Sequence, residues 1–525
     1  MTGKRGVDWQ GGDATTEALE RVALGTPLRL EEAVWSRVLK SHEQLARFRS
    51  ENRQIYGVTT GYGPLANTLV GSDHSEALQR NLVAHLSAGV GEPLTAEQTR
   101  ATMAARISAL SLGASGIAPE ALNHLLTCLN ADALPVVPSM GTVGASGDLT
   151  PLAHIAGALM GEGWICHNGR EAEPAKNVLE RLGLAPLEPG GKDALALVNG
   201  TSTMTGIAAL NDCLTERALR WSALTTVAHA QALRGRREAW HSAFGELRPH
   251  PGQQKLHRWL AVLDGASPDA MTDEERVGQD ALQQLESPIQ DPYSLRCAPQ
   301  LLGAVCDQLD WHSATVTTEL NSVTDNPILP DTPDQALHGG NFYGQHVALA
   351  SDALANAVIT LGVHAERRIA RIATPRLNEG LPAFLQGVDT GLQSGFMGAQ
   401  VTASALLAEM RTQATPASIQ SIPTNGDNQD VVTMGTIGAR RTHHLLALLY
   451  RLLAIDALMA VQALELRAEP QLRSEATEQM MAWVRARSPA LTSDRALSGD
   501  IETTAQAMRS PESLPVALTS SHGID

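Results

Sequence analysis

Long stretches of helical hydrophobic periodicity dominate the second half of the chain. Apolar residues recur at helical spacing over residues 204–233, 300–320, 345–372 and 434–466. Each stretch is longer than the usual globular helix, and several such rods side by side are typical of a helix bundle. Their alanine-rich, weakly charged faces carry too much apolar surface for one bundle in water, so we expect part of it to be buried between subunits.

The first half of the chain has shorter and less regular patterns. Helical periodicity predicts helices over about 31–48, 76–89 and 96–112. A polar interruption at 164–174 predicts a hairpin, and the glycines and the proline of residues 56–64 predict a turn-rich loop. We therefore expect small irregular and β elements in the N-terminal part of a mainly helical protein.

The composition favours packed helices over sheets. The 525 residues are 43% hydrophobic, which is enough for a large core, but only 3% aromatic. Because strands are enriched in aromatic and β-branched residues, we predict a mostly α-helical fold. We divide it into two regions that are not independently stable domains. The N-terminal region is residues 1–194, and the long-helix bundle with the C-terminal region is residues 195–525.

The charge and the apolar segments exclude some classes of protein. A formal net charge of −16 argues against a nucleic-acid partner or an anionic membrane partner. Five scattered cysteines without a CxxC pair fit a reducing compartment, and the N-terminus shows no apolar targeting segment. The apolar run 445–464 is interrupted by Arg451 and Asp456, so it predicts a buried helix and not a membrane span. We expect a cytoplasmic protein.

The string GTVGASGDLTP at residues 141–151 is the most informative part of the chain. If the backbone nitrogen of Gly147 attacks the carbonyl carbon of Ala145, a five-membered ring closes. Loss of water from that ring and from the side chain of Ser146 leaves an exocyclic methylidene, which is a strong electrophile. Glycine suits the attacking position because it has no side chain to obstruct the backbone. The ordinary alternative is a glycine-rich turn before a helix that Asp148 caps.

Asparagine-rich polar strings occur at the ends of the predicted rods. They are residues 195–202, 291–299, 319–327, 338–345 and 424–430. Amide side chains that meet at rod ends would form a polar pocket, because buried polar groups need hydrogen-bond partners. Helix capping is the alternative for any single string, since asparagine caps helices well. Four of the five tyrosines also lie in glycine- or proline-rich loops, which hints at a use beyond packing.

Neither a metal motif nor a cofactor motif stands out. The histidine pairs 443/444 and 338/346 lack the spacing of metal ligands, so we expect no metal site. The chain has neither a P-loop nor a dinucleotide-binding fingerprint, so we expect no diffusible cofactor. The glycines around Ser146 are one residue short of the G-x-S-x-G pattern, which makes a serine hydrolase a poor fit.

Taken together, these strings resemble the aromatic amino-acid ammonia-lyase family, which includes histidine, phenylalanine and tyrosine ammonia-lyases and related aminomutases. The resemblance runs from about Tyr56 to Arg467, and its core is the string GTVGASGDLTPLAH that begins at Gly141. It implies the long-helix bundle of the histidine ammonia-lyase type. It also implies a 4-methylidene-imidazol-5-one group formed autocatalytically from Ala145-Ser146-Gly147, and a homotetramer whose active sites each draw residues from three subunits.

The resemblance implies roles for individual residues. Tyr56 matches the catalytic tyrosine on the family's mobile lid, and Asn199 matches the amide that helps to polarise the prosthetic group. Tyr293 matches a second tyrosine near the reaction centre, and Arg296 matches the cation that binds the substrate carboxylate. The other positions implied to bind substrate are Gly63, Asn326, Phe342, Asn425, Asn428 and Gln429.

Substrate choice is implied by the pair His85-Leu86. Histidine-specific members usually have Ser-His at this place and phenylalanine-specific members an apolar pair, whereas His-Leu is similar to tyrosine ammonia-lyases. The physical chemistry agrees, because an imidazole can hydrogen-bond a substrate phenol while Leu86 supplies an apolar wall. A pocket built around such a bond disfavours an analogue without the hydroxyl, since its own polar group is left unpaired.

The resemblance therefore implies non-oxidative deamination of L-tyrosine to trans-4-hydroxycinnamate and ammonia. We expect the electrophile at Ser146 to capture the substrate amine and Tyr56, as phenolate, to remove the β-proton. The alternatives are a phenylalanine or histidine ammonia-lyase, and a tyrosine 2,3-aminomutase that returns ammonia to the β-carbon. A non-catalytic helical assembly is a further alternative, against which the intact Ala-Ser-Gly, Tyr56 and Arg296 count.

Overall fold

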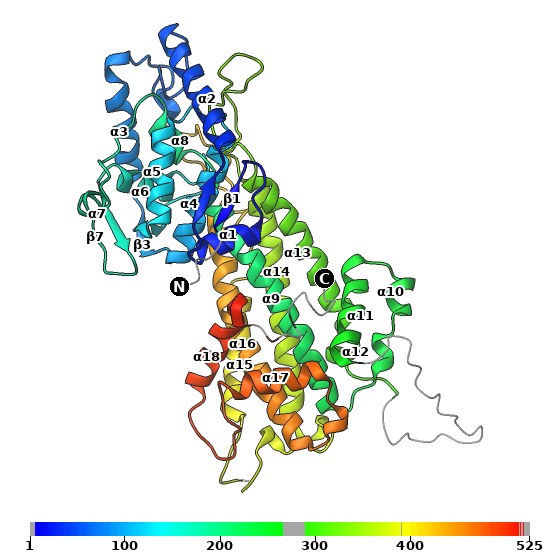
Figure 1. Ribbon diagram of the computed structural model, residues 1–525. Coiled ribbons are helices and arrows are strands. Elements are labelled where there is room, and N and C mark those ends of the chain that lie inside the picture. The colour runs from blue at the N-terminus through cyan, green and yellow to red at the C-terminus, as the bar shows by residue number, and fades with distance from the viewer. Residues whose placement is uncertain (1–5, 266–288, 390, 514, 516–517, 519–525) are drawn as a thin grey trace. The chain divides into compact units, whose positions relative to one another are not determined.

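Four long helices match the four rods that the periodicity predicts. The computed structural model describes residues 6–265, 289–389, 391–513, 515 and 518 (Figure 1). The long helices are α9 (Ser202–Ala232), α13 (Ala298–Leu320), α14 (Gln345–Ala373) and α16 (Gly435–Arg467). With 23 to 33 residues each, they confirm the predicted rods and the mostly α-helical fold.

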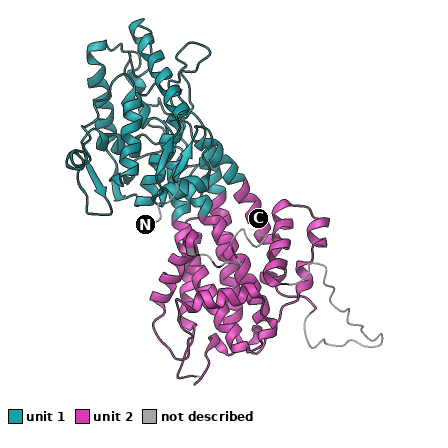
Figure 2. Cartoon of the chain, viewed as in Figure 1, with its two compact units in different colours: residues 1–213, 311–353, 416–443 teal, residues 214–310, 354–415, 444–525 magenta. Residues whose placement is uncertain are grey.

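The chain forms two compact units (Figure 2). Unit 1 contains residues 1–213, 311–353 and 416–443, and unit 2 contains residues 214–310, 354–415 and 444–525. Both units are therefore discontinuous in sequence. Each of the four long helices contributes residues to both of them.

Unit 1 is built mainly from helices of the N-terminal region. They are α1 (Thr16–Ala23), α2 (Glu32–Ser50), α3 (Ser75–Leu86), α4 (Ala96–Leu110), α5 (Pro119–Asn130), α6 (Leu149–Leu159), α7 (Ala175–Arg181) and α8 (Asp193–Val198), with 3₁₀ turns η1 (Gly63–Leu65) and η2 (Ser72–His74). The predicted helices near 31–48, 76–89 and 96–112 are thus confirmed. A capping box of Thr95 and Gln98 begins α4, which is buried over nearly its whole length.

Short strands complete unit 1. Strand β1 (Val7–Trp9) pairs in parallel with β2 (Leu28–Leu30), and β3 (Val90–Pro93) pairs antiparallel with β5 (Pro138–Met140). A three-stranded antiparallel sheet has the order β4 (Ala133–Pro135), β6 (Trp164–His167) and β7 (Glu173–Pro174). Since β6 and β7 are neighbours in that sheet, the predicted hairpin at 164–174 is confirmed.

Unit 2 packs its other helices around segments of the long ones. They are α10 (Ala243–Leu247), α11 (Pro251–Asp264), α12 (Tyr293–Arg296), α15 (Met397–Thr412), α17 (Glu475–Arg485) and α18 (Ser498–Arg509), with 3₁₀ turns η3 (Arg237–Trp240), η4 (Pro375–Leu377), η5 (Ala383–Leu385), η6 (Pro470–Leu472) and η7 (Pro511–Ser513). Leucine, alanine and methionine side chains form its core, to which α16 contributes most densely.

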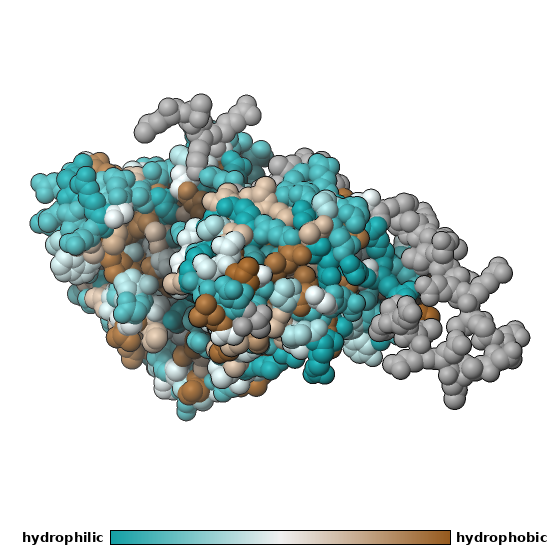
Figure 3. Space-filling model, turned by 90° about the horizontal axis from the view of Figure 1, so that it is seen from below, coloured by the Kyte–Doolittle hydropathy of each residue, from teal (hydrophilic) through white to brown (hydrophobic). Residues whose placement is uncertain are grey.

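Two of the described helices, α14 and α16, are long and apolar enough to cross a membrane. However, 83% of the most apolar window of α16 and 61% of that of α14 is buried inside the protein. Core helices of soluble proteins have the same composition, so the prediction of a buried helix over residues 445–464 is confirmed for α16. Apolar residues that remain exposed are interspersed with hydrophilic ones on the face drawn in Figure 3.

Candidate active site

A cavity of about 920 Å³ lies in unit 1 and collects side chains from distant parts of the chain. Its walls come from the loop around Tyr56, the end of α3, residues 141–150, the end of α8, and the loops that precede α14 and α16. Most of the predicted site residues line it, namely Tyr56, Gly63, His85, Leu86, Ala145, Ser146, Gly147, Asn199, Asn326, Phe342, Asn425, Asn428 and Gln429. The cavity is therefore lined by many of the amides that the sequence places at rod ends.

The Ala145-Ser146-Gly147 segment is tightly confined at one wall of the cavity. The backbones of Ala145 and Gly147 pair with each other although only one residue separates them, and Gly147 also pairs with Gly200. Gly147 has a φ of +70°, and a Cβ placed on it would be 2.2 Å from the carbonyl oxygen of Gly200. Only glycine fits this position, which agrees with an unobstructed backbone nitrogen as nucleophile.

Two amide side chains donate hydrogen bonds to Ser146. Asn199 Nδ2 donates to the Ser146 carbonyl oxygen at 3.1 Å, and Gln429 Nε2 donates to Ser146 Oγ at 3.2 Å. One donor thus polarises the carbonyl and the other contacts the hydroxyl that dehydration would remove. The residues present fit a methylidene-imidazolone, because its three source residues, a compressed backbone and polarising donors occur together.

The prediction that Asp148 caps its own helix is wrong. Asp148 precedes α6 but makes no side-chain hydrogen bond to it. Its carboxylate instead accepts from the backbone nitrogen of Met204 at 2.7 Å, in the first turn of α9, and from the hydroxyl of Thr436 at the start of α16. The reason lies in α6 itself, whose third residue is Pro151 and has no N–H to donate.

The buried position of Asp148 also changes its acidity. Burial raises the pKa of this carboxyl to about 6, against the opposing effect of its hydrogen bonds to Thr436 and to backbone N–H groups. The backbone nitrogen of Asp148 donates to the carbonyl oxygen of Gly200 at 2.7 Å. Asp148 therefore ties the end of the Ala145–Gly147 segment to the start of two long helices.

Two tyrosines from one loop reach the cavity, and their hydroxyl groups differ in environment. Tyr56 Oη accepts a hydrogen bond from the backbone nitrogen of Gly63 at 2.9 Å. Tyr62 Oη accepts from Gln79 Nε2 at 2.9 Å, and burial raises the pKa of Tyr62 well above its ordinary value. The two rings pack edge to face, with their centroids 6.2 Å apart. Tyr62 therefore stays protonated, which leaves Tyr56 as the tyrosine suited to act as a base.

The backbone of Gly63 allows the contact with Tyr56. Gly63 has a φ of +53°, and a Cβ placed on it would be 2.5 Å from Asn425 Nδ2. The close approach of Asn425 brings the loop that precedes α16 against the Tyr56 loop. A side chain at residue 63 would therefore disturb both walls of the cavity at once.

His85 and Leu86 lie together in the last turn of α3 and both line the cavity. His85 Nδ1 is 2.8 Å from the carbonyl oxygen of Asn81, one helical turn earlier. A carbonyl oxygen only accepts, so Nδ1 carries the proton and Nε2 of the neutral ring is an acceptor. The imidazole can thus accept a hydrogen bond from a ligand hydroxyl, beside the apolar side chain of Leu86.

Tyr293 and Arg296 do not line this cavity. Both lie in unit 2 on the four-residue helix α12, where Tyr293 is 71% exposed and the Arg296 guanidinium is 4.6 Å from the centre of its ring. Arg296 lines a smaller cavity of about 300 Å³ with Gln290 and Asp291. These two predicted site residues therefore belong to a different compact unit from those that line the larger cavity.

Buried polar groups hold α12 in place. Trp240 Nε1 donates to the carbonyl oxygen of Leu295 at 3.0 Å, and His364 Nε2 contacts the carbonyl oxygen of Ser294 at 2.8 Å. Burial and the charge of Arg368 lower the pKa of His364 to about 3, so the ring is neutral. Arg368 donates to His364 Nδ1 at 2.6 Å, which leaves the proton on Nε2 to bind α12.

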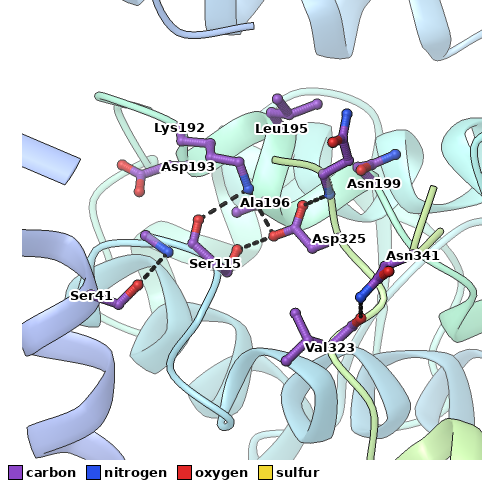
Figure 4. Close-up of polar contacts among 12 residues, drawn as sticks. Ser41, Ser115, Lys192, Asp193, Leu195, Ala196, Asn199, Val323, Asp325 and Asn341 are labelled. Carbon is purple, nitrogen blue, oxygen red and sulfur yellow. Dashed lines mark hydrogen bonds and ion pairs between the residues drawn. The ribbon is translucent and has the colours of Figure 1, made fainter. Parts of the chain in front are cut away.

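The structure adds a buried ion pair that the sequence did not predict (Figure 4). Lys192 Nζ is 2.8 Å from Asp325 Oδ2, with both side chains almost completely buried. Burial lowers the pKa of Lys192, and the neighbouring Asp325 opposes that shift. Asp325 stands in one of the predicted polar strings, directly before Asn326, but no periodic pattern or motif marks Lys192.

Among the described residues, no group of three or more His, Cys, Asp or Glu side chains is placed to hold a metal ion. The polar groups of the cavity are mainly amides and hydroxyls, which suits hydrogen bonding more than metal coordination.

The sequence model of the family described as aromatic amino acid lyase matches residues 14–486. The chain belongs to this family. This chain is therefore an enzyme, an aromatic amino acid lyase. Its relatives carry several named activities. It is 46% identical to a tyrosine ammonia-lyase of Cereibacter sphaeroides, over 95% of this chain and 95% of that protein.

Solved structures place the lyase in the same fold. A tyrosine aminomutase from Streptomyces globisporus matches with a TM-score of 0.91 and 37% identity, covering 96% of this chain and 97% of the other. A histidine ammonia-lyase from Trypanosoma cruzi matches with a TM-score of 0.88 and 32% identity, covering 98% of this chain and 96% of the other. The expected long-helix bundle of the histidine ammonia-lyase type is therefore confirmed.

Proposed function

We propose that this lyase deaminates L-tyrosine non-oxidatively to trans-4-hydroxycinnamate and ammonia. The observation that carries the proposal is the His85-Leu86 pair, in which the hydrogen bond of Nδ1 to Asn81 leaves Nε2 as an acceptor for a phenol. The 46% identical relative named tyrosine ammonia-lyase supports it. An apolar wall beside one acceptor matches an aromatic ring that carries one para hydroxyl.

The proposed prosthetic group is the methylidene-imidazolone from Ala145-Ser146-Gly147. It supplies an electrophile for the substrate amine, so that nitrogen becomes a better leaving group. Two side chains of the protein hydrogen-bond residue 146. Asn199 Nδ2 donates to the carbonyl oxygen of residue 146, and Gln429 Nε2 donates to the Ser146 hydroxyl that leaves as water when the group forms.

Tyr56 is the proposed base for the β-proton. Its hydroxyl is oriented by the N–H of Gly63, a donor that also stabilises a phenolate. Tyr62 is unsuited to the same task, because burial holds its pKa high and keeps it neutral. In this arrangement one tyrosine loses its proton and the neighbouring one provides a rigid, uncharged support.

The substrate carboxylate is the proposed partner of Arg296, supplied with Tyr293 by another subunit of a cytoplasmic homotetramer. The exposure of Tyr293 supports this, because an aromatic ring that is 71% exposed is suited to burial against a neighbour. Leu349 on α14 and Ile437 on α16 are also 48% and 41% exposed. These positions supply apolar surface for subunit contacts along the long helices.

The experiment that tests the function offers L-tyrosine, L-phenylalanine and L-histidine separately to the purified protein and identifies each product by chromatography. We expect 4-hydroxycinnamate from tyrosine as the main reaction. Cinnamate or urocanate as the faster product would contradict tyrosine specificity. β-Tyrosine as the main product would favour a 2,3-aminomutase, which the 0.91 TM-score with a tyrosine aminomutase makes the second candidate.

A His85 variant tests the role of this residue in substrate selection. His85→Phe removes the acceptor but keeps an aromatic ring, so we expect the ratio of kcat/KM for tyrosine over phenylalanine to fall by about 10- to 100-fold. Because Nε2 accepts, 4-aminophenylalanine, which can donate, should be a better substrate of the native enzyme than 4-methylphenylalanine. An unchanged ratio in the variant would remove His85 from substrate selection.

A further inference from the structure

Lys192, Asp325 and Arg106 form a buried cluster of charged side chains, and Figure 4 draws the contacts between Lys192 and Asp325. Lys192 Nζ contacts Asp325 Oδ2 at 2.8 Å and the carbonyl oxygen of Ser115 at 3.0 Å. The hydroxyl of Ser115 donates to the same carboxylate oxygen, and Arg106 Nη2 is 4.0 Å from it. The side chains of Lys192, Asp325 and Arg106 are at most 2% exposed. None of these residues lines the cavity.

The cluster holds helix α8 at both of its ends. Lys192 directly precedes the first residue of α8, and Arg106 donates a hydrogen bond to the carbonyl oxygen of Ala196, in the last turn. Helix α8 has only six residues, and the residue that ends it is Asn199. The position of the Asn199 amide, which donates to Ser146, therefore depends on both attachments.

The same cluster holds the backbone that carries Asn326. Asp325 Oδ1 accepts from the backbone nitrogen of Asn326 at 2.6 Å, while its other oxygen binds Lys192. Asn326 Oδ1 in turn accepts from the backbone nitrogen of Gly339 at 2.7 Å. One carboxylate thus connects the start of α8 with a second amide of the cavity.

Tight backbone packing connects the cluster to the Ala145–Gly147 segment. A Cβ placed on Gly200 would be 2.0 Å from Arg106 Nη1 and 2.8 Å from the carbonyl oxygen of Thr324. On the other side, Gly147 packs against Gly200 just as closely. Three layers of chain are therefore in direct contact, from Arg106 through Gly200 to Gly147.

A buried ion pair is poor evidence for stability, because removing two charges from water costs about as much as their attraction returns. Its better-attested use is to select one arrangement over others. We propose that Lys192 and Asp325 are positioning residues that set the spacing between the amides of Asn199 and Asn326. This inference rests on the proposed function of the cavity.

The test compares three variants of the full chain: Lys192→Met, Asp325→Asn and the double variant. Each single change breaks the Lys192–Asp325 pair and is expected to lower the Tm. The double variant removes both charges but leaves the buried Arg106 beside a neutral residue 325, so its Tm should recover only in part. Its kcat should nevertheless stay about 10- to 100-fold below the native value, because the attachment of α8 to Asp325 is still missing.

A second readout is the intact mass of each subunit, in which ring formation appears as the loss of two water molecules. We expect the fraction of subunits with this loss to fall in the double variant. The double variant Lys40→Met/Asp331→Asn is the matched control. Lys40 and Asp331 are also 2.8 Å apart and lie on α2 and the segment after Asn326, but they are 66% and 73% exposed. The fraction of subunits that lose two waters, the kcat and the Tm of this control variant should match those of the native enzyme.

The outcomes separate positioning from folding. Native kcat and complete loss of two waters in a stable Lys192→Met/Asp325→Asn variant would overturn the proposal. If the single variants do not fold, Ser115→Ala, which removes only one hydrogen bond to the carboxylate, replaces them with a smaller expected loss of kcat. Turnover is measured with whichever amino acid the native enzyme deaminates fastest. A different preferred substrate would then contradict tyrosine specificity and leave this test intact.

Discussion

Tyr56 and Tyr62 lie on one loop and both reach the cavity, but only one of them has the surroundings of a base. The hydroxyl of Tyr56 accepts from the backbone N–H of Gly63. The hydroxyl of Tyr62 is bound to Gln79 at a buried position, and burial raises its pKa. The two hydroxyl groups thus differ in their hydrogen-bond donors, a backbone N–H for Tyr56 and an amide side chain for Tyr62.

The comparison of Tyr56→Phe with Tyr62→Phe tests this assignment. Loss of the Tyr56 hydroxyl should lower kcat by about 10²- to 10⁴-fold, which is the usual contribution of proton transfer. The loss of two water molecules on ring formation and the assembly of subunits should be the same as in the native enzyme. Loss of the Tyr62 hydroxyl should lower stability by about 1 kcal/mol and largely keep kcat. Steady-state kinetics and thermal unfolding measure both. A larger activity loss for Tyr62→Phe would exchange the two roles.

At the scale of elements, the short helix α8 and the start of α9 carry the site. Asn199 ends α8, Gly200 packs between the Ala145–Gly147 segment and Arg106, and Met204 in the first turn of α9 donates to Asp148. These contacts all involve backbone groups close to the cavity. A change in either helix is therefore expected to displace the Ala145–Gly147 segment, the proposed source of the prosthetic group.

Gly200→Ala is the substitution that this packing resists most directly. The added methyl group would overlap Arg106 Nη1 and the carbonyl oxygen of Thr324, so overpacking should cost about 1–3 kcal/mol and lower the fraction of subunits that lose two waters. Mass spectrometry and the Tm check this. Gly71→Ala, where nothing lies within 4 Å of the added Cβ, is the control and should behave as native. Complete ring formation in Gly200→Ala would contradict the role of this contact.

Elements with strong periodicity could be predicted from the sequence, and those defined by distant partners could not. The ends of α9, α13, α14 and α16 follow from the hydrophobic pattern, because that signal is local to each helix. The partners of Asp148 did not follow, since they lie at the starts of two helices far along the chain. Lys192 was missed for the same reason. Its role depends on Asp325, 133 residues away.

At the scale of the whole molecule, the predicted site residues fall into two groups on one chain. Tyr56, His85 and Asn199 meet in the cavity of unit 1, whereas Tyr293 and Arg296 lie on α12 in unit 2. Trp240 and His364 each hydrogen-bond the backbone of α12. This support fits the proposal that Tyr293 and Arg296 serve a site on another subunit.

Mixed assemblies of two inactive variants test whether subunits share sites. The Tyr56→Phe and Arg296→Ala enzymes should each be nearly inactive. If Tyr56 and Arg296 of one site come from different subunits, a random 1:1 mixture should have both residues intact in roughly a quarter of its sites. Co-expression with two affinity tags isolates the mixture for assay. Activity no higher than that of the separate variants would mean that one chain supplies both residues.

The exposed position of α12 has a consequence for the biology of the enzyme. Tyr293 is exposed on the single chain, and if the proposed shared sites exist, a newly synthesised protomer has an incomplete reaction centre until its partners bind. Catalytic output would then rise more steeply than gene dosage, because copies that never meet contribute nothing. A cell could silence the reaction simply by keeping the enzyme scarce, without any inhibitor.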